Sequence, residues 1–176
     1  MSTIPEHPLV RMHARASHPE TRDGTALAWI PDPTAASSKV VRWSYRELWS
    51  VASNAAAEVR RALEGVDAPR LSDMQDIDGL SPTVGLLVED GVELPVAILA
   101  ILLAGGAVVP LGANDPPARI KDVLDDAGCS AAIASDRAGD GGAVRRLREA
   151  LTEAGRADFT VISVASLLSN ESRETA

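Results

Sequence analysis

Aromatic residues are scarce in this sequence: one Phe, one Tyr and three Trp make up 3% of the chain, although 45% of its residues are hydrophobic. Ala, Val and Leu must therefore fill the interior, and side chains of this size suit helices packed on a sheet. Charged residues make up 24%, as in an ordinary soluble globular protein. A length of 176 residues indicates one domain or part of a larger one.

Cysteine is nearly absent, since Cys129 is the only one, and this excludes an intrachain disulfide. Cys129 follows Gly128 at a predicted helix-to-strand turn, with no histidine nearby in the sequence. This position favours a buried structural thiol over a nucleophile, and it is compatible with a reducing compartment.

Positive charge is in deficit, because the formal net charge is −8. Non-specific nucleic-acid binding needs Lys and Arg to neutralise phosphates, and anionic membranes attract basic segments. We therefore expect neither a nucleic acid nor a membrane surface as a partner.

A secretory signal is missing from the first residues, "MSTIPEHPLVRMHARAS", which contain no apolar stretch. We expect a cytoplasmic protein. The same residues contain arginine and few acids, so the sequence leaves organelle import open as well.

Charge is lacking over one long run, from Leu94 to Asn114, which is long enough to span a bilayer. Prolines and glycines interrupt the run, and the charges that border it are mostly acidic, unlike the flanks of a membrane span. A buried helix followed by a buried strand explains the run better, so we expect no membrane span.

The second half of the chain predicts an α/β fold. Strands are expected at 83–88, 107–111, 130–135 and 159–163, and helices from about 90 to 104, at 115–128 with Asp115 as its cap, and at 143–155. These strands are continuously apolar and not alternating, so both faces of their sheet should be covered. The β-α-β-α-β-α-β order predicts a parallel sheet with right-handed crossovers and helices on both faces.

The first half predicts a β-hairpin and helices. A helix is expected at 6–17, a hairpin with strands at 25–30 and 39–44, a helix at 45–63, and a loop at 64–82. Ser44 and Glu47 have the spacing of a capping box at the start of the helix 45–63. We expect one partial domain over 1–164 and a polar, disordered tail over 165–176.

Candidate metal and acid–base groups do not converge in the sequence. His7, His13 and His18 are the only histidines, and their spacing does not place them on one helix face. The acidic pairs Asp125–Asp126 and Glu89–Asp90 fit helix ends better than a catalytic dyad, because adjacent residues point in different directions.

The glycine-rich stretches are not phosphate-binding loops. Neither Gly105–Gly106 nor "GDGG" at 139–142 is followed by the Lys and Ser or Thr that such a loop requires. We therefore expect no catalytic, cofactor-binding or metal-binding residue in this chain.

Two stretches resemble motifs of the adenylate-forming synthetase superfamily, which includes acyl-CoA synthetases, non-ribosomal peptide synthetase adenylation domains and luciferases. "WSYREL" at 43–48 resembles the first core motif, L-[ST]-Y-x-E-L, and "LLAGGAVVPLG" at 102–112 resembles L-K-A-G-x-A-Y-V-P-L-D. The segments at 117–120 and 124–128 resemble the "P-A-E-R-I" and "L-x-D-[SA]-G" motifs that follow. The similarity is collinear from about residue 9 to 135 and weaker to 164.

The sequence also departs from the family pattern. Leu103, Val108 and Gly112 stand where the second motif has Lys, Tyr and Asp, which puts the subtype in doubt more than the fold. The family's phosphate loop, nucleotide-binding and Mg²⁺-linked residues and C-terminal domain have no counterpart in these 176 residues.

The resemblance implies an acid–thiol ligase that uses ATP and Mg²⁺ to convert a carboxylic acid into an acyl-adenylate, usually for transfer to CoA or to a carrier-protein thiol. It implies that this chain is a truncated N-terminal fragment, inactive alone, whose partner is the rest of the synthetase or a related chain. Two alternatives stay open: a stand-alone remnant used for interaction or regulation, and a small-molecule binding module.

Overall fold

The computed structural model describes residues 7–31, 34, 39–64, 81–88, 91–112, 114–135, 142–153, 155–156 and 159–169. The predicted loop at 64–82, the pair Glu89–Asp90 and the glycines at 139–141 lie almost wholly outside these residues.

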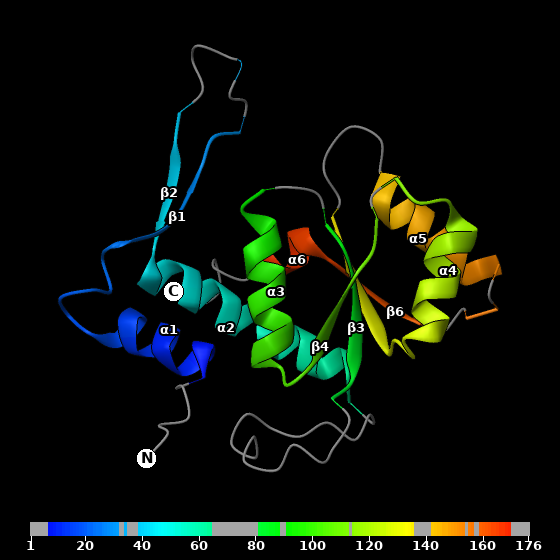
Figure 1. The fold of residues 1–176 in the computed structure, drawn as a ribbon, viewed down its shortest axis with the longest axis horizontal. Coiled ribbons are helices and arrows are strands. Elements are labelled where there is room, and N and C mark those ends of the chain that lie inside the picture. The colour runs from blue at the N-terminus through cyan, green and yellow to red at the C-terminus, as the bar shows by residue number, and fades with distance from the viewer. Residues whose placement is uncertain are drawn as a thin grey trace, which may run out of the picture.

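The N-terminal part contains a β-hairpin between two helices. Its elements are α1 (Pro8–Ser17), β1 (Thr25–Trp29), β2 (Val41–Ser44) and α2 (Tyr45–Ala62). The two strands pair antiparallel, which confirms the predicted hairpin. Figure 1 shows the hairpin projecting away from the rest of the molecule.

The second half forms a parallel sheet in the order β4-β3-β5-β6. Its strands are β3 (Thr83–Leu87), β4 (Ala107–Pro110), β5 (Ala131–Ala134) and β6 (Thr160–Ser163). The helices are α3 (Glu93–Leu103), α4 (Pro117–Asp126), α5 (Gly142–Glu153) and α6 (Val164–Ser169). The predicted α/β fold and the parallel pairing are confirmed.

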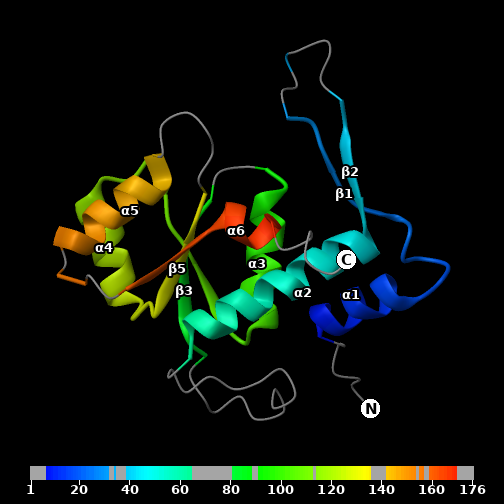
Figure 2. The same ribbon diagram turned by 180° about the vertical axis from the view of Figure 1, so that it is seen from behind.

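Both faces of the sheet are covered by helices, as the continuously apolar strands predicted. On one face, which we call the α3 side, α2, α3 and α6 pack on Val84, Ile133 and Ile162. On the other, the α4 side, α4 and α5 pack on Leu87 and Ala132. The two views show α2, α3 and α6 on one side of the sheet and α4 and α5 on the other (Figures 1 and 2).

The uncharged run from Leu94 to Asn114 is divided between a helix and a strand, as the sequence predicted. Gly105, which has a φ of 85°, ends the turn after α3. An ordinary L-residue would be strained there, so the glycine suits the change of direction into β4. Among the described residues, no helix is long and apolar enough to cross a membrane.

The predicted tail at 165–176 is wrong for its first residues. Residues 164–169 form α6, and Leu167 is only 1% exposed. Val164 and Leu167 join the core on the α3 side, and this burial outweighs the polarity that begins at Ser169. Residues 170–176 lie outside the described part.

The predicted cap of α4 is also wrong. Pro116 occupies the N-cap position, and no side chain caps this helix. Asp115 instead accepts a hydrogen bond from the backbone N–H of Gly112, at 3.2 Å. The two prolines set the start of α4 without a cap, because their missing N–H groups need no acceptor.

The capping box at the start of α2 is confirmed. The backbone N–H of Glu47 donates to Ser44 Oγ at 3.2 Å, and Glu47 Oε2 accepts from the Ser44 backbone N–H at 2.7 Å. The Ser44 hydroxyl also donates to the same carboxylate at 2.7 Å. Chiefly through the Ser44 backbone hydrogen bond, the cap lowers the pKa of Glu47 below its ordinary value of 4.5.

We predict that the contribution of Glu47 to stability depends on pH. Because its pKa is lower in the folded state, the contribution is complete above the unfolded-state pKa and is lost as the pH falls through the folded pKa. Denaturant titrations of the wild type and of Glu47→Gln should therefore differ most near neutrality and converge in acid. A constant difference at all pH values would contradict this role.

Candidate functional site

The two motifs that resemble the synthetase family contribute to the same hydrophobic cluster. "WSYREL" leads into α2, and "LLAGGAVVPLG" contains the end of α3 and all of β4. Helices α2 and α3 share one hydrophobic cluster, which contains Val51, Ala55, Ala100 and Ile101. Two segments that are far apart in the sequence therefore meet in one hydrophobic core.

A hydrogen bond joins the C-terminal ends of the two motif helices, α2 and α3. The Arg60 guanidinium of α2 donates to the backbone carbonyl of Leu103, in the last turn of α3, at 2.7 Å. This carbonyl is among those that a helix leaves without an intrahelical partner. Sequence reasoning missed Arg60, because nothing in the local pattern shows that an acceptor 43 positions later lies beside it.

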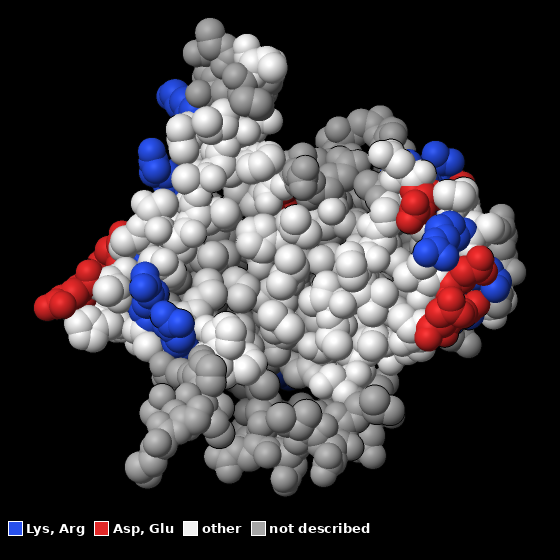
Figure 3. Space-filling model, viewed as in Figure 1, with Lys and Arg blue, Asp and Glu red and all other residues white. Residues whose placement is uncertain are grey.

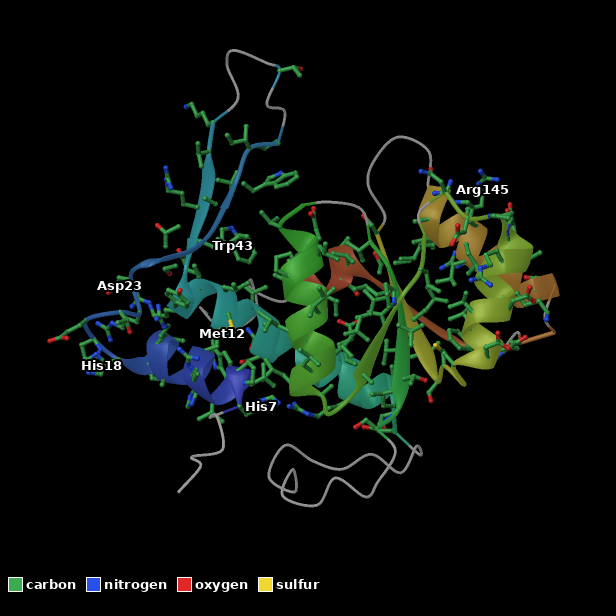
Figure 4. All side chains as sticks on the ribbon, viewed as in Figure 1. His7, Met12, His18, Asp23, Trp43 and Arg145 are labelled. Carbon is green, nitrogen blue, oxygen red and sulfur yellow. The ribbon has the colours of Figure 1, made fainter. Side chains whose placement is uncertain are left out.

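The residues of the first motif have structural contacts. Trp43 packs on the cluster of the α3 side, and Figure 4 shows it at the base of the hairpin. The Tyr45 hydroxyl accepts a hydrogen bond from Arg15 at 3.3 Å, and Arg46 pairs with Asp23 at 2.6 Å. These contacts join the hairpin, α1 and α2, and they assemble no set of groups for chemistry.

The sheet has a topological switch point between β3 and β5. The connection after β3 leads to β4 on one side, whereas the connection after β5 leads to β6 on the other. In open α/β sheets, ligands bind outside the carboxyl ends of the strands at such a point. This edge, near Glu93 at the start of α3 and the buried Ser135 after β5, is the best candidate site that the fold offers.

The chemistry of that edge is incomplete in the described residues. Ser135 uses its backbone N–H to bond the carbonyl of Leu87 at 3.0 Å, so it extends the sheet. The connections after β3 and β5 pass through residues 89–90 and 136–141, which are outside the described part. No described residue at this edge supplies the positive charge that would offset phosphate oxygens.

The three histidines are exposed and lie apart. Nδ1 of His7 accepts the N–H of Leu9 at the start of α1, and Nδ1 of His18 accepts the N–H of Glu20, both at 3.3 Å. Figure 4 shows His7 and His18 at opposite ends of α1. Within the ranges that the structure describes, no three His, Cys, Asp or Glu residues form a group that could hold a metal ion.

Cys129 is buried, as the sequence predicted, with 1% of its surface exposed. Burial raises the pKa of the thiol, and this outweighs the opposing effects of Thr83 and Arg156. A buried thiol that resists ionisation has little nucleophilic character.

A shallow concavity of about 430 Å³ lies beside β6, lined by Arg148, Leu151, Thr152, Arg156, Phe159 and Val161. Its deeper guanidinium, that of Arg156, already donates to Asp125 at 3.0 Å and to the Cys129 carbonyl at 2.6 Å, and it lies over the Phe159 ring. Asp125 also pairs with Lys121, whose hydrogen bond is the main cause of its lowered pKa. Asp125, one residue of the predicted acidic pair, thus joins α4 to the segment after α5.

The comparison with known proteins identifies the family. The family described as AMP-binding enzyme matches residues 20–175. The chain belongs to this family, as its two motifs indicated.

The relatives are much longer than this chain. Nonribosomal peptide synthetase 7 of Gibberella zeae is 42% identical over 77 residues, which are 43% of this chain and 2% of that protein. A benzoate CoA ligase from Burkholderia xenovorans is 26% identical, with a TM-score of 0.54 over 73% of this chain and 23% of the ligase. The nonribosomal peptide synthetase FmoA3, solved with AMPPNP bound, is 25% identical, with a TM-score of 0.57 over 94% of this chain and 14% of FmoA3.

We predict that Arg60→Ala lowers the free energy of unfolding by about 1 kcal/mol, because the Leu103 carbonyl loses its charged donor. Arg61→Ala is the matched control: it makes the same change in helix propensity at an exposed neighbour and should change the stability by less than about 0.5 kcal/mol. Urea titrations of both variants test this. Equal losses would mean that the Arg60 hydrogen bond contributes nothing.

We also predict that Cys129 is inert in the folded protein. A thiol reagent such as a disulfide dye should modify it orders of magnitude more slowly in the native state than in denaturant, because the sulfur is inaccessible and protonated. Rapid modification of the folded chain would contradict a purely structural role.

Proposed function

We propose that these residues are the N-terminal part of an ATP-dependent ligase that activates a carboxylic acid as an acyl-adenylate. The observation that supports this most directly is the family match over residues 20–175, together with the packing of both family-like motifs in one core. In this proposal the chain supplies scaffold, namely the sheet that forms the candidate ligand-binding edge and the helices α2 and α3 that pack on it.

In the proposed complete enzyme, ATP, Mg²⁺ and the carboxylic acid bind to residues outside this chain. Stabilising the charge that develops on the leaving pyrophosphate requires cationic groups aimed at the phosphates. The sequence has no glycine-rich loop followed by Lys and Ser or Thr, and its candidate edge offers no such cation in the described part. The thiol of CoA or of a carrier protein is the proposed acceptor of the acyl group.

We predict that the purified 176-residue chain releases no pyrophosphate above background from ATP and Mg²⁺ with any member of a panel of carboxylic acids. A complete ligase assayed in parallel is the positive control. Turnover by this chain alone would contradict the proposal that ATP and the acid bind to residues outside it.

The genomic sequence gives an independent test of the same proposal. Beyond codon 176 we expect an open frame with a Ser/Thr/Gly-rich stretch ending in Lys. An in-frame stop with stable expression of the short chain would instead favour the second candidate, a non-catalytic interaction or regulatory module. The observation that favours this candidate is the apolar sequence of α3, in which Leu102 is 36% exposed.

A further inference from the structure

The concavity beside β6 lies at the opposite end of the sheet from the candidate site. Arg156 follows α5 and Phe159 comes directly before β6, so the concavity lies at the amino end of this strand. The Arg156 guanidinium donates to the carbonyl of Cys129, which comes shortly before β5 and therefore lies at the same end of the sheet. A ligand in this concavity is therefore separate from the switch point at the carboxyl ends of the strands.

The lining of the concavity is partly apolar and partly cationic. Leu151 is 5% exposed, and Phe159 and Val161 are half-buried, whereas Arg148 is exposed. The volume of about 430 Å³ is within the range of small-molecule sites, which are mostly apolar with a few polar groups that orient the ligand. Such a lining suits a small ligand that has an apolar body and a negatively charged group.

The guanidinium of Arg156 is held in position before any ligand binds. It donates to Asp125 at 3.0 Å and to the Cys129 carbonyl at 2.6 Å, and its Cζ lies over the Phe159 ring, 4.5 Å from the ring centre. A guanidinium has five N–H donors, so these two hydrogen bonds leave others without a protein partner in the described part. Because the side chain is already fixed and is 31% exposed, it can bind a carboxylate with little loss of side-chain entropy.

Positive charge is incompletely paired around the concavity. Asp125 is shared, because it also pairs with Lys121 at 3.0 Å. Arg148 forms no ion pair with the residues that the structure describes, whereas Arg145 on the same helix pairs with Glu149. Figure 3 shows charged side chains of opposite sign side by side over α4 and α5. Two guanidiniums, one without a carboxylate and one with a shared carboxylate, thus line the same concavity and favour an added anion.

Thr152 is the remaining polar residue of the lining. Its hydroxyl donates to the backbone carbonyl of Arg148 at 2.8 Å, so its hydrogen is already used. The side-chain donors that the lining offers to a ligand are therefore the guanidiniums, which bind carboxylates through two parallel hydrogen bonds. A bare inorganic anion would leave Leu151 and Val161 in contact with water, whereas an apolar body attached to the anion would cover them.

We propose that this concavity is a binding site for a small carboxylate with an apolar body, such as an aryl or branched alkyl acid. The carboxylate binds the guanidiniums of Arg148 and Arg156, and the apolar body covers Leu151 and Val161. The site is distinct from the candidate ligand-binding edge, and it does not depend on the proposed function.

Titration of the 176-residue chain with three probes tests the site. Phenylacetate has both required features, phenylacetamide has the same shape without the charge, and inorganic phosphate has the charge without the apolar body. We expect phenylacetate to bind with a dissociation constant of about 1–10 mM and the other two probes to bind at least about tenfold more weakly. Amide NMR signals of Thr152, Phe159 and Val161 should shift, whereas that of Ser135 at the candidate edge should not.

Three results of these titrations would overturn the proposal. Equal binding of phenylacetamide would show that the guanidiniums do not select the charge. Equal binding of phosphate would assign the concavity to inorganic anions. Binding of phenylacetate that does not saturate, or that shifts the signals at the candidate edge instead, would show that the concavity is not the site.

Arg148→Gln should weaken the binding of phenylacetate by about fivefold or more, because one guanidinium is lost. Arg145→Gln is the matched control: it makes the same change at an exposed residue of α5 that does not line the concavity, and it should change the affinity by less than about twofold. Arg156→Lys keeps the charge but loses the planar fork of donors, so it should also weaken binding.

The midpoint of thermal unfolding, which Arg148→Gln and Arg145→Gln should leave nearly unchanged, shows whether the variants are folded. Equal weakening by these two substitutions would reveal a general effect of charge and contradict the proposed site. Unchanged affinity in both Arg148→Gln and Arg156→Lys would contradict it as well.

Discussion

The contact between α2 and α3 is the constraint on which the rest of the structure depends. Helix α2 carries the hairpin and α1 at its beginning, and α3 connects the first two strands of the parallel sheet. Small side chains, including Ala55, Ala97 and Ala100, are completely buried where the helices meet. Because these side chains are short, the backbones can approach closely, and Arg60 reaches the last turn of α3. Together with the packing of α2 on the sheet and the hydrogen bond from Ser166 to Glu58, this contact holds the N-terminal third to the rest of the chain.

This constraint gives the two family-like motifs a structural role. A motif can mark a family because its residues are needed to form the core and not because they touch a substrate. Gly105 turns the chain from α3 into β4, and Ser44 starts α2. Gly105 thereby helps to position the sheet whose carboxyl edge is the place where α/β folds bind ligands. Membership of the AMP-binding enzyme family therefore defines the scaffold of this chain more than its activity.

The partly exposed outer side of α3, which includes Leu102, links stability to the proposed function. An apolar helix face is costly when it remains in water, and a sheet edge with unpaired backbone groups invites association. The same features are ordinary in the interior of a larger fold. The stability of the molecule thus depends on whether further polypeptide covers this side of α3.

Local patterns in the sequence determined most of the elements. The capping box, the hairpin, the four strands and the end of α3 at its glycines follow from hydrogen-bonding groups and side-chain periods within a few positions. The sequence also determined the family, because two motifs occur in the right order and at the right separation. The lack of alternation predicted strands buried on both faces, and helices cover both faces of the sheet as expected.

Only the tertiary structure decided the contacts between distant residues. The sequence predicted a tail in place of the last helix, α6, because so short a segment has weak local preferences. The burial of Leu167 on the α3 side of the sheet stabilises this helix. Asp115 looked like a cap, yet it bonds Gly112 because two prolines already start α4. Arg60 has no local signal at all. Such contacts depend on which surfaces the chain brings together, and periodicity within one segment carries no information about its neighbour.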